Sequence, residues 1–224
     1  MTEGPVSVAA HLRRDLSVDQ QHALKTAATR LHTEFGEHFG VETIERFLHS
    51  SYDQFAGRAT IPNFLPLLAE RWARQRLIAL ARVEGKITDD KPTVLFLCTH
   101  NAGRSQMALG YFNYLAEEHG IAWSGGSEPG DQINPSAVAA MAEVGIDITR
   151  EFPKPWTDEI VQATDVVVTM GCGDACPFFP GKRYENWELP DPAGQDVEAV
   201  RPIRDDIEER VRGLLHDLGI TPIR

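Results

Sequence analysis

The stretch Val94–Ser105, VLFLCTHNAGRS, constrains the fold more than any other part of the chain. A short apolar and β-branched run leads directly into Cys98, and Arg104 follows after five intervening residues. Helical periodicity begins at about Arg104, so the pattern predicts a buried parallel strand, a tight loop and a helix start. Gly103 allows the loop backbone angles that other residues resist. We therefore expect Cys98 at the mouth of a loop that joins a strand to a helix.

The predicted loop has the composition of an anion site. Its backbone N–H groups can point inward beside the unpaired N–H groups of the helix start, and such a nest holds a tetrahedral oxyanion. Arg104 adds a planar fork that can bond two oxygens at once. The same positive potential favours the thiolate of Cys98, and Ser105 can donate a hydrogen bond to its sulfur. A cysteine alone is more often a small buried apolar residue, but this context predicts a nucleophile below a bound oxyanion.

Cys98-x5-Arg104-Ser105 after a strand resembles the phosphate-binding loop of the low-molecular-weight protein tyrosine phosphatase superfamily. The run CTHNAGRSQMA resembles the arsenate reductase branch more closely, where an Asn at the position of Asn101 shapes the loop. The resemblance covers about residues 92–219. It implies an enzyme that acts on arsenate with Cys98, Arg104 and Ser105 as catalytic residues. The substrate-binding loop that it implies consists of Thr99, His100, Asn101, Ala102, Gly103 and Arg104.

From Pro92 onward the pattern alternates between strands and helices. Strands are expected at 93–97, 121–127, 165–170 and 183–187. Helices are expected at 104–119, 136–144, 157–163 and 197–218. Parallel strands with crossover helices predict an open four-stranded α/β sheet with helices on both faces, spanning 92–220, as in the phosphatase-like fold that the resemblance implies. The anion site of such a sheet lies at the carboxyl ends of the strands, near the topological switch point.

Residues 1–88 are expected to form a separate small all-α domain of three helices. Ser17 and Gln20 have the capping-box spacing at the start of the first helix. The second helix runs from about Val41, and Pro62 suits the first turn of the third. Amphipathic helices with short connections predict a bundle, and the polar segment Glu84–Lys91 is its expected boundary.

The predicted bundle carries no catalytic constellation, and its scattered histidines do not predict a metal site. Certain reductases of the resembling family carry a similar helical extension. Small helical appendages with aromatic faces often bury them against a second copy, and two-fold pairing is the commonest arrangement. We therefore expect either a homodimer formed through these helices or a bundle packed against the second domain.

Asp191 stands in the segment LPDPAG, which follows the last predicted strand. A carboxylate there lies at the carboxyl edge of the sheet, beside the expected anion site. Displacement at a tetrahedral oxyanion leaves an oxygen that needs a proton, and a positioned acid contributes about 10²- to 10⁴-fold. The resembling family has an Asp-Pro loop at this place, which implies that Asp191 is the catalytic acid. An ordinary Asp-Pro turn is the competing interpretation.

Cys172 and Cys176 lie close together in GCGDACP, after the third predicted strand. A structural disulfide, half of a zinc site and a redox relay are all open from these residues alone. The resemblance implies the relay, in which Cys172 attacks the Cys98 sulfur, Cys176 resolves the bridge and thioredoxin reduces the last disulfide. In the thioredoxin-coupled class of the family the last two cysteines are further apart. A related branch joins mycothiol to the arsenic adduct, with a glutaredoxin-like protein as partner. Tyrosine phosphatase action and a non-enzymatic redox sensor also stay open.

Composition bounds the partners and the location of the enzyme. The net charge of −11 argues against nucleic acid as a partner. The sequence contains no run of eighteen apolar residues, so we expect no membrane span. The N-terminus does not have the pattern of a secretory signal. An odd count of three cysteines does not predict a disulfide framework. We therefore expect a cytoplasmic enzyme with no tightly bound cofactor or metal.

Overall fold

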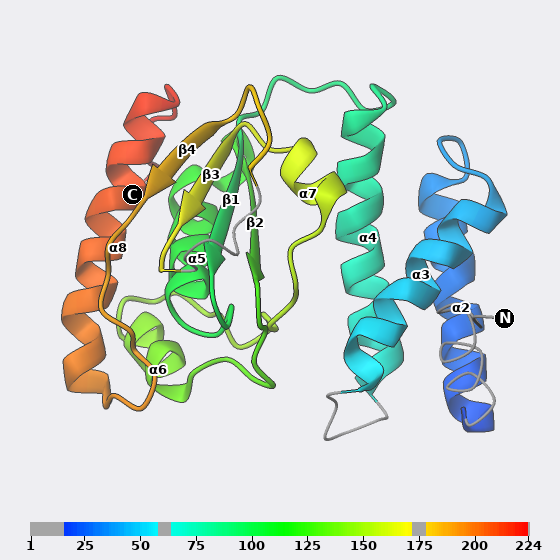
Figure 1. Ribbon diagram of the computed structural model, residues 1–224, viewed down its shortest axis with the longest axis horizontal. Helices are drawn as coiled ribbons and strands as arrows, with labels where there is room; N and C mark the ends of the chain where they lie inside the picture. The colour runs from blue at the N-terminus through cyan, green and yellow to red at the C-terminus, as the bar shows by residue number, and fades with distance from the viewer. Residues whose placement is uncertain (1–15, 58–63, 172–177, 224) are drawn as a thin grey trace, which may run out of the picture. The chain divides into compact units, whose positions relative to one another are not determined.

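The computed structural model describes residues 16–57, 64–171 and 178–223. The chain divides after Ile87 into two compact units, which we call the helical unit and the α/β unit (Figure 1). Cys172 and Cys176 lie outside the described residues, as does Pro62. Within the described part of the chain, no helix is both long and apolar enough to cross a membrane.

Three helices make up the described part of the helical unit: α2 (Val18–Phe35), α3 (Val41–Ala56) and α4 (Leu65–Val83). The predicted capping box is present, because the Ser17 hydroxyl accepts from the Gln20 backbone and the Gln20 side chain accepts from the Ser17 backbone. Such a cap stabilises a helix by about 1 kcal/mol. Within α4 the first turn contains Pro66.

The core of the helical unit is the apolar stripe that each helix turns toward the other two. Trp72 of α4 is fully buried and is among the largest side chains of the interior. All three helices also contribute buried apolar residues at helical spacing: Leu24, Ala27, Leu31, Phe35, Ile44, Leu48, Phe55, Ala69 and Leu77. Burial of these side chains, about 25 cal/mol per Å² of apolar surface, holds the bundle together.

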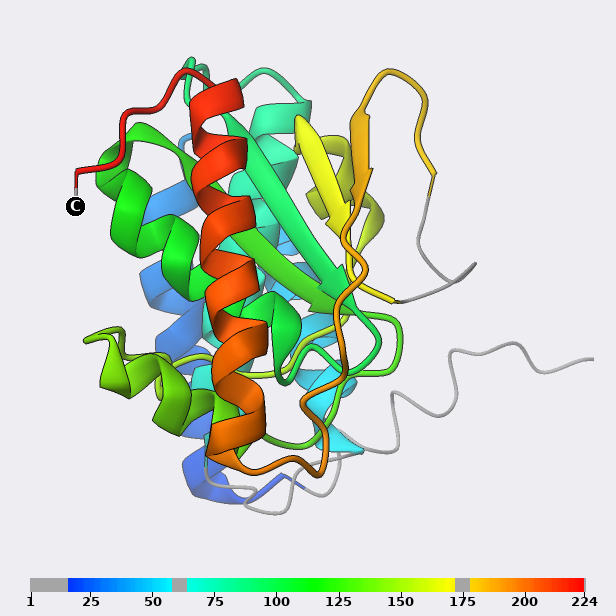
Figure 2. The ribbon, with the colours of Figure 1, turned by 90° about the vertical axis from the view of Figure 1, so that its left-hand side faces the viewer.

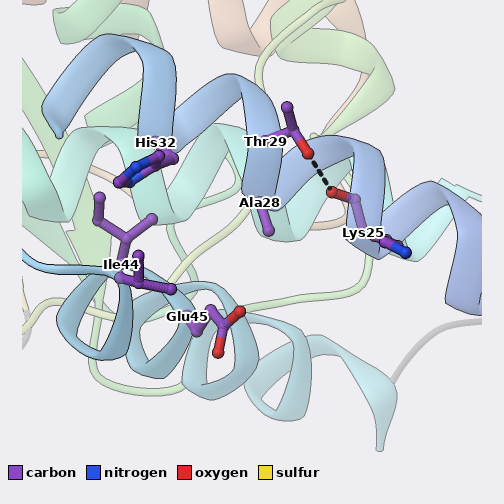
Figure 3. Close-up of a pocket in the computed structure, with 7 residues that line it drawn as sticks. Lys25, Ala28, Thr29, His32, Ile44 and Glu45 are labelled. Carbon is purple, nitrogen blue, oxygen red and sulfur yellow. Dashed lines mark hydrogen bonds between the residues drawn. The ribbon is translucent and has the colours of Figure 1, made fainter.

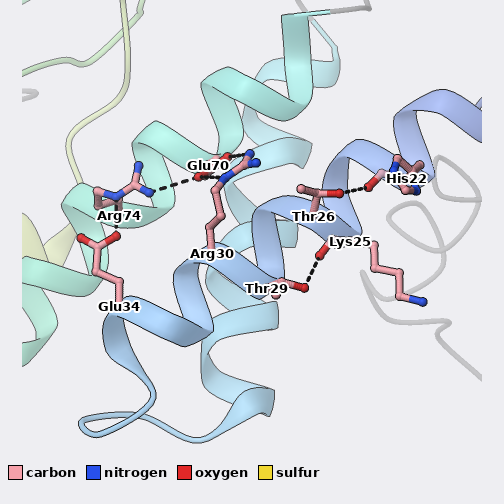
Figure 4. Close-up of polar contacts among 8 residues, drawn as sticks. All are labelled: His22, Lys25, Thr26, Thr29, Arg30, Glu34, Glu70 and Arg74. Atoms are coloured by element: carbon pink, nitrogen blue, oxygen red, sulfur yellow. Dashed lines mark hydrogen bonds and ion pairs between the residues drawn. The ribbon is translucent and has the colours of Figure 1, made fainter.

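One buried carboxylate, Glu70 of α4, joins two helices of this unit through arginines (Figure 4). Both of its oxygens accept from the Arg30 fork of α2, and one also accepts from Arg74 at 3.1 Å. Arg74 in turn donates to Glu34 at 2.7 Å. The hydrogen bonds from Arg30 and then Arg74 hold the pKa of Glu70 below its ordinary value despite its burial. These four charges form an ionic cluster that we call the Glu70 cluster.

A shallow apolar groove of about 240 Å³ runs between α2 and α3 (Figure 3). Its lining side chains are Lys25, Ala28, Thr29, His32, Val41, Ile44 and Glu45. Several large apolar residues of the same unit are also exposed, among them Val18, Val41, Phe64 and Leu67. Apolar surface of the helical unit is therefore exposed to solvent outside its buried core.

The α/β unit alternates strands and helices, as predicted. Its strands are β1 (Thr93–Cys98), β2 (Ile121–Gly126), β3 (Val166–Thr169) and β4 (Arg183–Asn186). Its helices are α5 (Arg104–Ala116), the 3-10 turn η3 (Glu117–His119), α6 (Pro135–Glu143), α7 (Asp158–Gln162) and α8 (Val197–Asp217). The single long helix expected over 104–119 therefore ends as an α-helix at Ala116 and continues as a 3-10 turn.

All four strands are parallel, in the order β2-β1-β3-β4. The chain passes from β1 to β2 on one side and then returns to β3 on the other side of β1. The carboxyl end of β1 is therefore the topological switch point, where ligands of such sheets bind. Cys98 is the last residue of β1 and pairs with Gly126 of β2.

Helices cover both faces of the sheet, as predicted; α8 and α7 lie on opposite sides of it (Figures 1 and 2). One face packs against α5, α6 and α8, and its buried cluster includes Phe96, Cys98 and Met107. The opposite face buries Leu95 and the α7 side chain Ile160. The predicted architecture is confirmed: an open four-stranded parallel α/β sheet with helices on both faces, preceded by a small helical region.

Candidate active site

The loop between β1 and α5 has its backbone carbonyls on the outside. The carbonyls of Thr99, His100 and Ala102 accept from backbone N–H groups of the segment 128–134, at 2.9, 2.9 and 2.8 Å. The carbonyl of Asn101 accepts from a side chain of α5 at 2.9 Å. Successive peptide carbonyls are therefore bonded to the surrounding protein and away from the centre of the loop.

The backbone N–H groups of the same loop are left free for a ligand. Among the described residues, no protein group accepts a hydrogen bond from the backbone N–H of residues 99–103. The helix that follows starts at Arg104, and its N-cap Gly103 has no side chain to cap it. Among the described residues, the backbone N–H groups of Arg104 and Ser105 have no acceptor either. N–H groups arranged in this way at the positive end of a helix can bind an anion, so the expected anion nest is kept as a candidate site.

Asn101 holds the loop in its unusual shape. Its backbone φ is +47°, in the left-handed region that Asn tolerates better than most residues. The buried Asn101 Oδ1 accepts from Gln106 Nε2 and from the backbone N–H of Lys154, both at 3.0 Å. Its Nδ2 donates to Ser105 Oγ at 2.8 Å. Two donors on the oxygen thus fix which way the amide points.

The orientation of the Asn101 amide also fixes the hydroxyl of Ser105. Ser105 Oγ lies 3.0 Å from Cys98 Sγ and already accepts from Asn101. Its own proton is therefore available to the sulfur of Cys98, which is 2 % exposed. The structure therefore brings together the Cys98 and Ser105 side chains that the sequence pattern paired.

Arg104 is buried beside the loop, but its fork is only weakly engaged. Its side chain is 8 % exposed. Its contacts in the described chain are Asp191 Oδ2 at 3.2 Å and the Leu189 carbonyl at 3.4 Å, both near the long limit of a hydrogen bond. A buried guanidinium has five N–H donors, so most of this hydrogen-bonding capacity remains for an oxyanion.

The carboxylate of Asp191 lies at the same carboxyl edge of the sheet, as expected. Its side chain is about half exposed, and Oδ1 accepts from the Ala193 backbone at 3.0 Å. The loop that carries it touches the anion loop, because a Cβ on Gly103 would lie 2.5 Å from Pro192 Cγ. Glycine at position 103 therefore allows the two loops to approach each other.

Cys98, Arg104 and Asp191 line one small cavity of about 40 Å³, together with residues of both loops and of the α6 start: His100, Ala102, Gly103, Asn134, Pro192 and Ala193. A water needs about 10–15 Å³ measured in this way. The cavity therefore has room for a small tetrahedral ion.

The anion loop is also tied to the end of β3. Thr99 Oγ1 donates to the Gly171 carbonyl at 3.0 Å, and a Cβ on Gly171 would lie 2.9 Å from Arg104 Nη1. Gly171 has a φ of +76°, which a glycine adopts without strain. Cys172 follows it in the chain but, with Cys176, lies outside the described residues.

Three residues at this site were not singled out from the sequence: Asn134, Gln106 and Lys154, whose backbone bonds to Asn101. Asn134 caps α6, lines the cavity and donates to the Pro192 carbonyl at 2.9 Å. Gln106 binds both oxygens of Asn101. The Asn-Pro pair at position 134 carries the signal of a helix start, but no local pattern connects it to the loop. The structure shows no metal-binding group of three or more His, Cys, Asp or Glu among the residues it describes.

A parallel sheet with a cysteine and arginine anion loop at its switch point defines a phosphatase-like, oxyanion-binding enzyme. Residues 93–221 match the family described as low molecular weight phosphotyrosine protein phosphatase. The chain belongs to this family. Residues 24–81 match a second family, described as protein-tyrosine-phosphatase-like, N-terminal domain.

Several proteins similar to this chain are arsenate reductases. The structure of the Corynebacterium glutamicum thioredoxin-dependent arsenate reductase Cg_ArsC1' is 41 % identical, with a TM-score of 0.80 over 88 % of this chain and 97 % of that one. Arsenate reductase 1 of Staphylococcus epidermidis is 38 % identical over 130 residues, which are 56 % of this chain and 97 % of the relative. Arsenate reductase of Staphylococcus xylosus is 39 % identical over 123 residues, 53 % and 92 % of the two chains. The predicted resemblance and the prediction of an enzyme are confirmed.

Proposed function

We propose that the protein is an arsenate reductase in which Cys98 is the nucleophile. The observation that carries this proposal is the arrangement of the loop after the buried Cys98: its carbonyls are bonded to the surrounding protein, and its N–H groups have no acceptor among the described residues. The weakly engaged fork of Arg104 adds two donors for arsenate oxygens. The arsenate reductase names of the relatives support arsenate as the oxyanion.

The first chemical step is displacement at arsenic. The Cys98 thiolate attacks arsenic, an S–As bond forms and an As–O bond breaks. Asp191 supplies the proton with which the oxygen leaves as water, and Ser105 and Arg104 hold the thiolate and the oxyanion. Asp191 is suited to this role because it lines the cavity and remains half exposed, so that solvent can return its proton. Thr99, His100, Asn101, Ala102 and Gly103 supply the loop that binds the ion.

The second step transfers two electrons to arsenic. The Cys172 thiolate attacks the Cys98 sulfur, the S–S bond forms, and the S–As electron pair stays on arsenic, which leaves as arsenite. Cys176 then attacks Cys172, which frees Cys98, and the dithiol of thioredoxin reduces the Cys172–Cys176 disulfide. Support for this order comes from the Thr99–Gly171 hydrogen bond, because it joins the residue after Cys98 to the residue before Cys172.

Arsenate-dependent oxidation of NADPH through thioredoxin reductase and thioredoxin tests the proposal. We expect turnover in the wild type, none in Cys98→Ser or Cys172→Ser, and at most one turnover in Cys176→Ser. Asp191→Asn is expected to lower kcat by about 10²-fold. Hydrolysis of an aryl phosphate without arsenate-dependent NADPH oxidation would instead identify a tyrosine phosphatase and contradict the proposal.

The close spacing of Cys172 and Cys176, with three intervening residues, favours one alternative electron donor. In that scheme mycothiol joins the arsenic adduct on Cys98 and a glutaredoxin-like protein completes the reduction. The two schemes differ in their need for Cys176. Multiple turnover by Cys176→Ser with mycothiol, and none with thioredoxin in the wild type, would replace the relay by the small-thiol route.

We also propose a homodimer formed through the helical unit, in a cytoplasmic enzyme. Exposed Phe64 and Leu67, at 59 % and 52 %, support an interface, and a thiol relay needs a reducing compartment. Sedimentation equilibrium should give a dimer for the wild type and a monomer for the double variant Phe64→Asp with Leu67→Asp. Phe178→Asp, at a still more exposed aromatic of the α/β unit, is the control. A monomeric wild type would contradict the dimer.

A further inference from the structure

Lys154, between α6 and α7, is a lysine whose side chain is fully buried in the α/β unit. Lysines are almost never fully buried unless their charge is paired. Its ammonium donates to the Phe152 carbonyl at 3.2 Å and lies 4.7 Å from the centre of the Phe152 ring. Its carboxylate partner, Glu151 Oε2, is 3.5 Å away. The proposed reaction steps leave this charge without a role.

The segment that carries Lys154 is bonded to the anion loop at two points. The backbone N–H of Lys154 donates to Asn101 Oδ1 at 3.0 Å. The Phe152 carbonyl, which binds the ammonium, also accepts from Gln106 Nε2 at 3.2 Å. Gln106 Nε2 is in turn a donor to Asn101. Every group on this path is buried, so water does not compete for its hydrogen bonds.

The path continues to the nucleophile. Asn101 Nδ2 donates to Ser105 Oγ, and Ser105 Oγ lies 3.0 Å from Cys98 Sγ. The ammonium therefore lies at one end of a continuous series of hydrogen bonds and the sulfur at the other. A displacement of the Phe152 carbonyl would release the donors that orient the Asn101 amide.

Fold stability alone does not explain a charge at this position. Replacing a buried ion pair by apolar side chains of similar volume is often neutral or stabilising. A methionine fills nearly the volume of a lysine and carries no desolvation cost. The ammonium makes a contact that a methionine cannot, because it donates a hydrogen bond to the Phe152 carbonyl.

We propose that Lys154 is a positioning residue for the anion loop, whose buried ammonium fixes the Phe152 carbonyl and thereby keeps the Ser105 proton directed at Cys98. The inference rests on the proposed function only in taking Cys98 as the nucleophile. Without the ammonium, the amide of Asn101 loses its fixed orientation, Ser105 no longer donates to sulfur in every molecule, and a smaller fraction of Cys98 is thiolate at neutral pH.

The rate of Cys98 alkylation by iodoacetamide as a function of pH tests this role. The background is Cys172→Ser with Cys176→Ser, which leaves Cys98 as the one thiol of the full chain. Three variants are made in this background: Lys154→Met, Lys154→Arg and the control Lys182→Met. Lys182 also binds a backbone carbonyl, that of Gln162, but does so at the protein surface. The charged neighbours of Cys98 in its cavity, His100, Arg104 and Asp191, are unchanged in all of them.

We expect Lys154→Met to raise the midpoint of the alkylation profile by about one pH unit, a tenfold loss of thiolate near neutrality. The concentration of inorganic phosphate that protects the thiol should rise by a similar factor. Lys154→Arg keeps the charge, so its midpoint and its phosphate protection should lie close to those of the parent protein. Lys182→Met should match the parent protein in both measurements.

An unchanged midpoint and unchanged phosphate protection in Lys154→Met would overturn the inference, even if its melting temperature fell. Should Lys154→Met not fold, Lys154→Gln replaces it, and the same unchanged midpoint overturns the inference. No turnover is measured, so failure of the arsenate reaction is a separate result. If the alkylation profile of Cys98 in the parent protein matched that of a free cysteine, the role of Cys98 itself would be refuted.

Discussion

The two units of this protein differ in how fully their arginines are bonded to carboxylates. In the Glu70 cluster of the helical unit, both carboxylate oxygens are occupied by two arginines, and Arg74 has a second carboxylate partner. In the α/β unit, Arg104 is buried more deeply than Arg74, at 8 % against 31 % exposure, yet it has one distant carboxylate and one distant carbonyl.

The difference separates an ionic cluster that stabilises the fold from a buried arginine whose donors are available to the proposed oxyanion. In the Glu70 cluster both oxygens of the buried carboxylate already have arginine donors, so the cluster contributes to the association of the helices. An unsaturated buried arginine is costly to the free protein, and an oxyanion removes that cost on binding. Substitution should therefore act on stability in the helical unit and on binding and rate in the α/β unit.

The largest effect is expected from Arg104→Lys. A lysine keeps the charge but loses the planar fork, so kcat/KM for arsenate should fall by about 10²- to 10³-fold. The free energy of unfolding should change by less than about 1 kcal/mol, because the native contacts of Arg104 are long. Arg210→Lys, at a partly exposed pair with Asp206, is the control for both measurements. A stability loss as large as the kinetic loss would remove the proposed distinction.

Glu70→Gln should have the converse effect. It removes the charge to which Arg30 and Arg74 are bonded, and hydrogen bonds between charged groups contribute about 1.5–3 kcal/mol each. We expect α2 and α4 to become less protected from hydrogen exchange by about 2 kcal/mol, with kcat/KM unchanged. Glu208→Gln, at an exposed pair with Arg212, should change neither quantity. Slower arsenate reduction by Glu70→Gln would contradict the separation of roles.

Gly103→Ala tests the contact between the two loops of the site. The added Cβ would meet Pro192 Cγ at 2.5 Å, so the loop that carries Asp191 must shift. Small displacements of a catalytic group lower rates steeply, and we expect kcat to fall about tenfold with a smaller change in KM. Gly213→Ala in α8, where no atom lies within 4 Å, should leave kcat unchanged. Equal kinetics in the two variants would show that the loops move independently.

The smallest effect is expected from acid. The pKa of Glu70 is lowered in the folded protein, chiefly by Arg30, from an ordinary value of 4.5. Its stabilising contribution is therefore complete above pH 4.5 and is lost as pH falls through the lowered folded value, because the unfolded chain takes up the proton first. Hydrogen exchange in α2 should differ between wild type and Glu70→Gln at neutral pH, and the difference should shrink below pH 4.5. A difference that stays constant with pH would exclude the carboxylate charge as its source.

Hydrophobic periodicity predicts the helices and strands of both units to within a few residues, because apolar spacing is a local property. The Cys98 loop is predictable for the same reason, since all of its ligand-facing groups lie within residues 98–105. What periodicity does not predict is what holds the loop. Its carbonyls bond to the segment 128–134, and its Asn101 bonds to Lys154, more than fifty residues away.

Asn134 and Lys154 illustrate the limit. In the sequence Asn134 is a helix cap and Lys154 is one charged residue among many. Only the packing of α6 and of the following segment against the loop brings them to the site. The roles given to Cys172 and Cys176 stay predictions, and the thiol variants described above test them.

The small cavity has a consequence for how the enzyme competes in a cell. In the proposed mechanism an ion enters it by losing its hydration shell, and the loop amides and the Arg104 guanidinium replace that shell without regard to the central atom. Arsenate and phosphate present the same four oxygens, so the pocket has no means of refusing the commoner of the two. Cellular phosphate will then set the arsenate concentration at which reduction begins, and selectivity arises only after binding, when arsenic but not phosphorus accepts two electrons from sulfur.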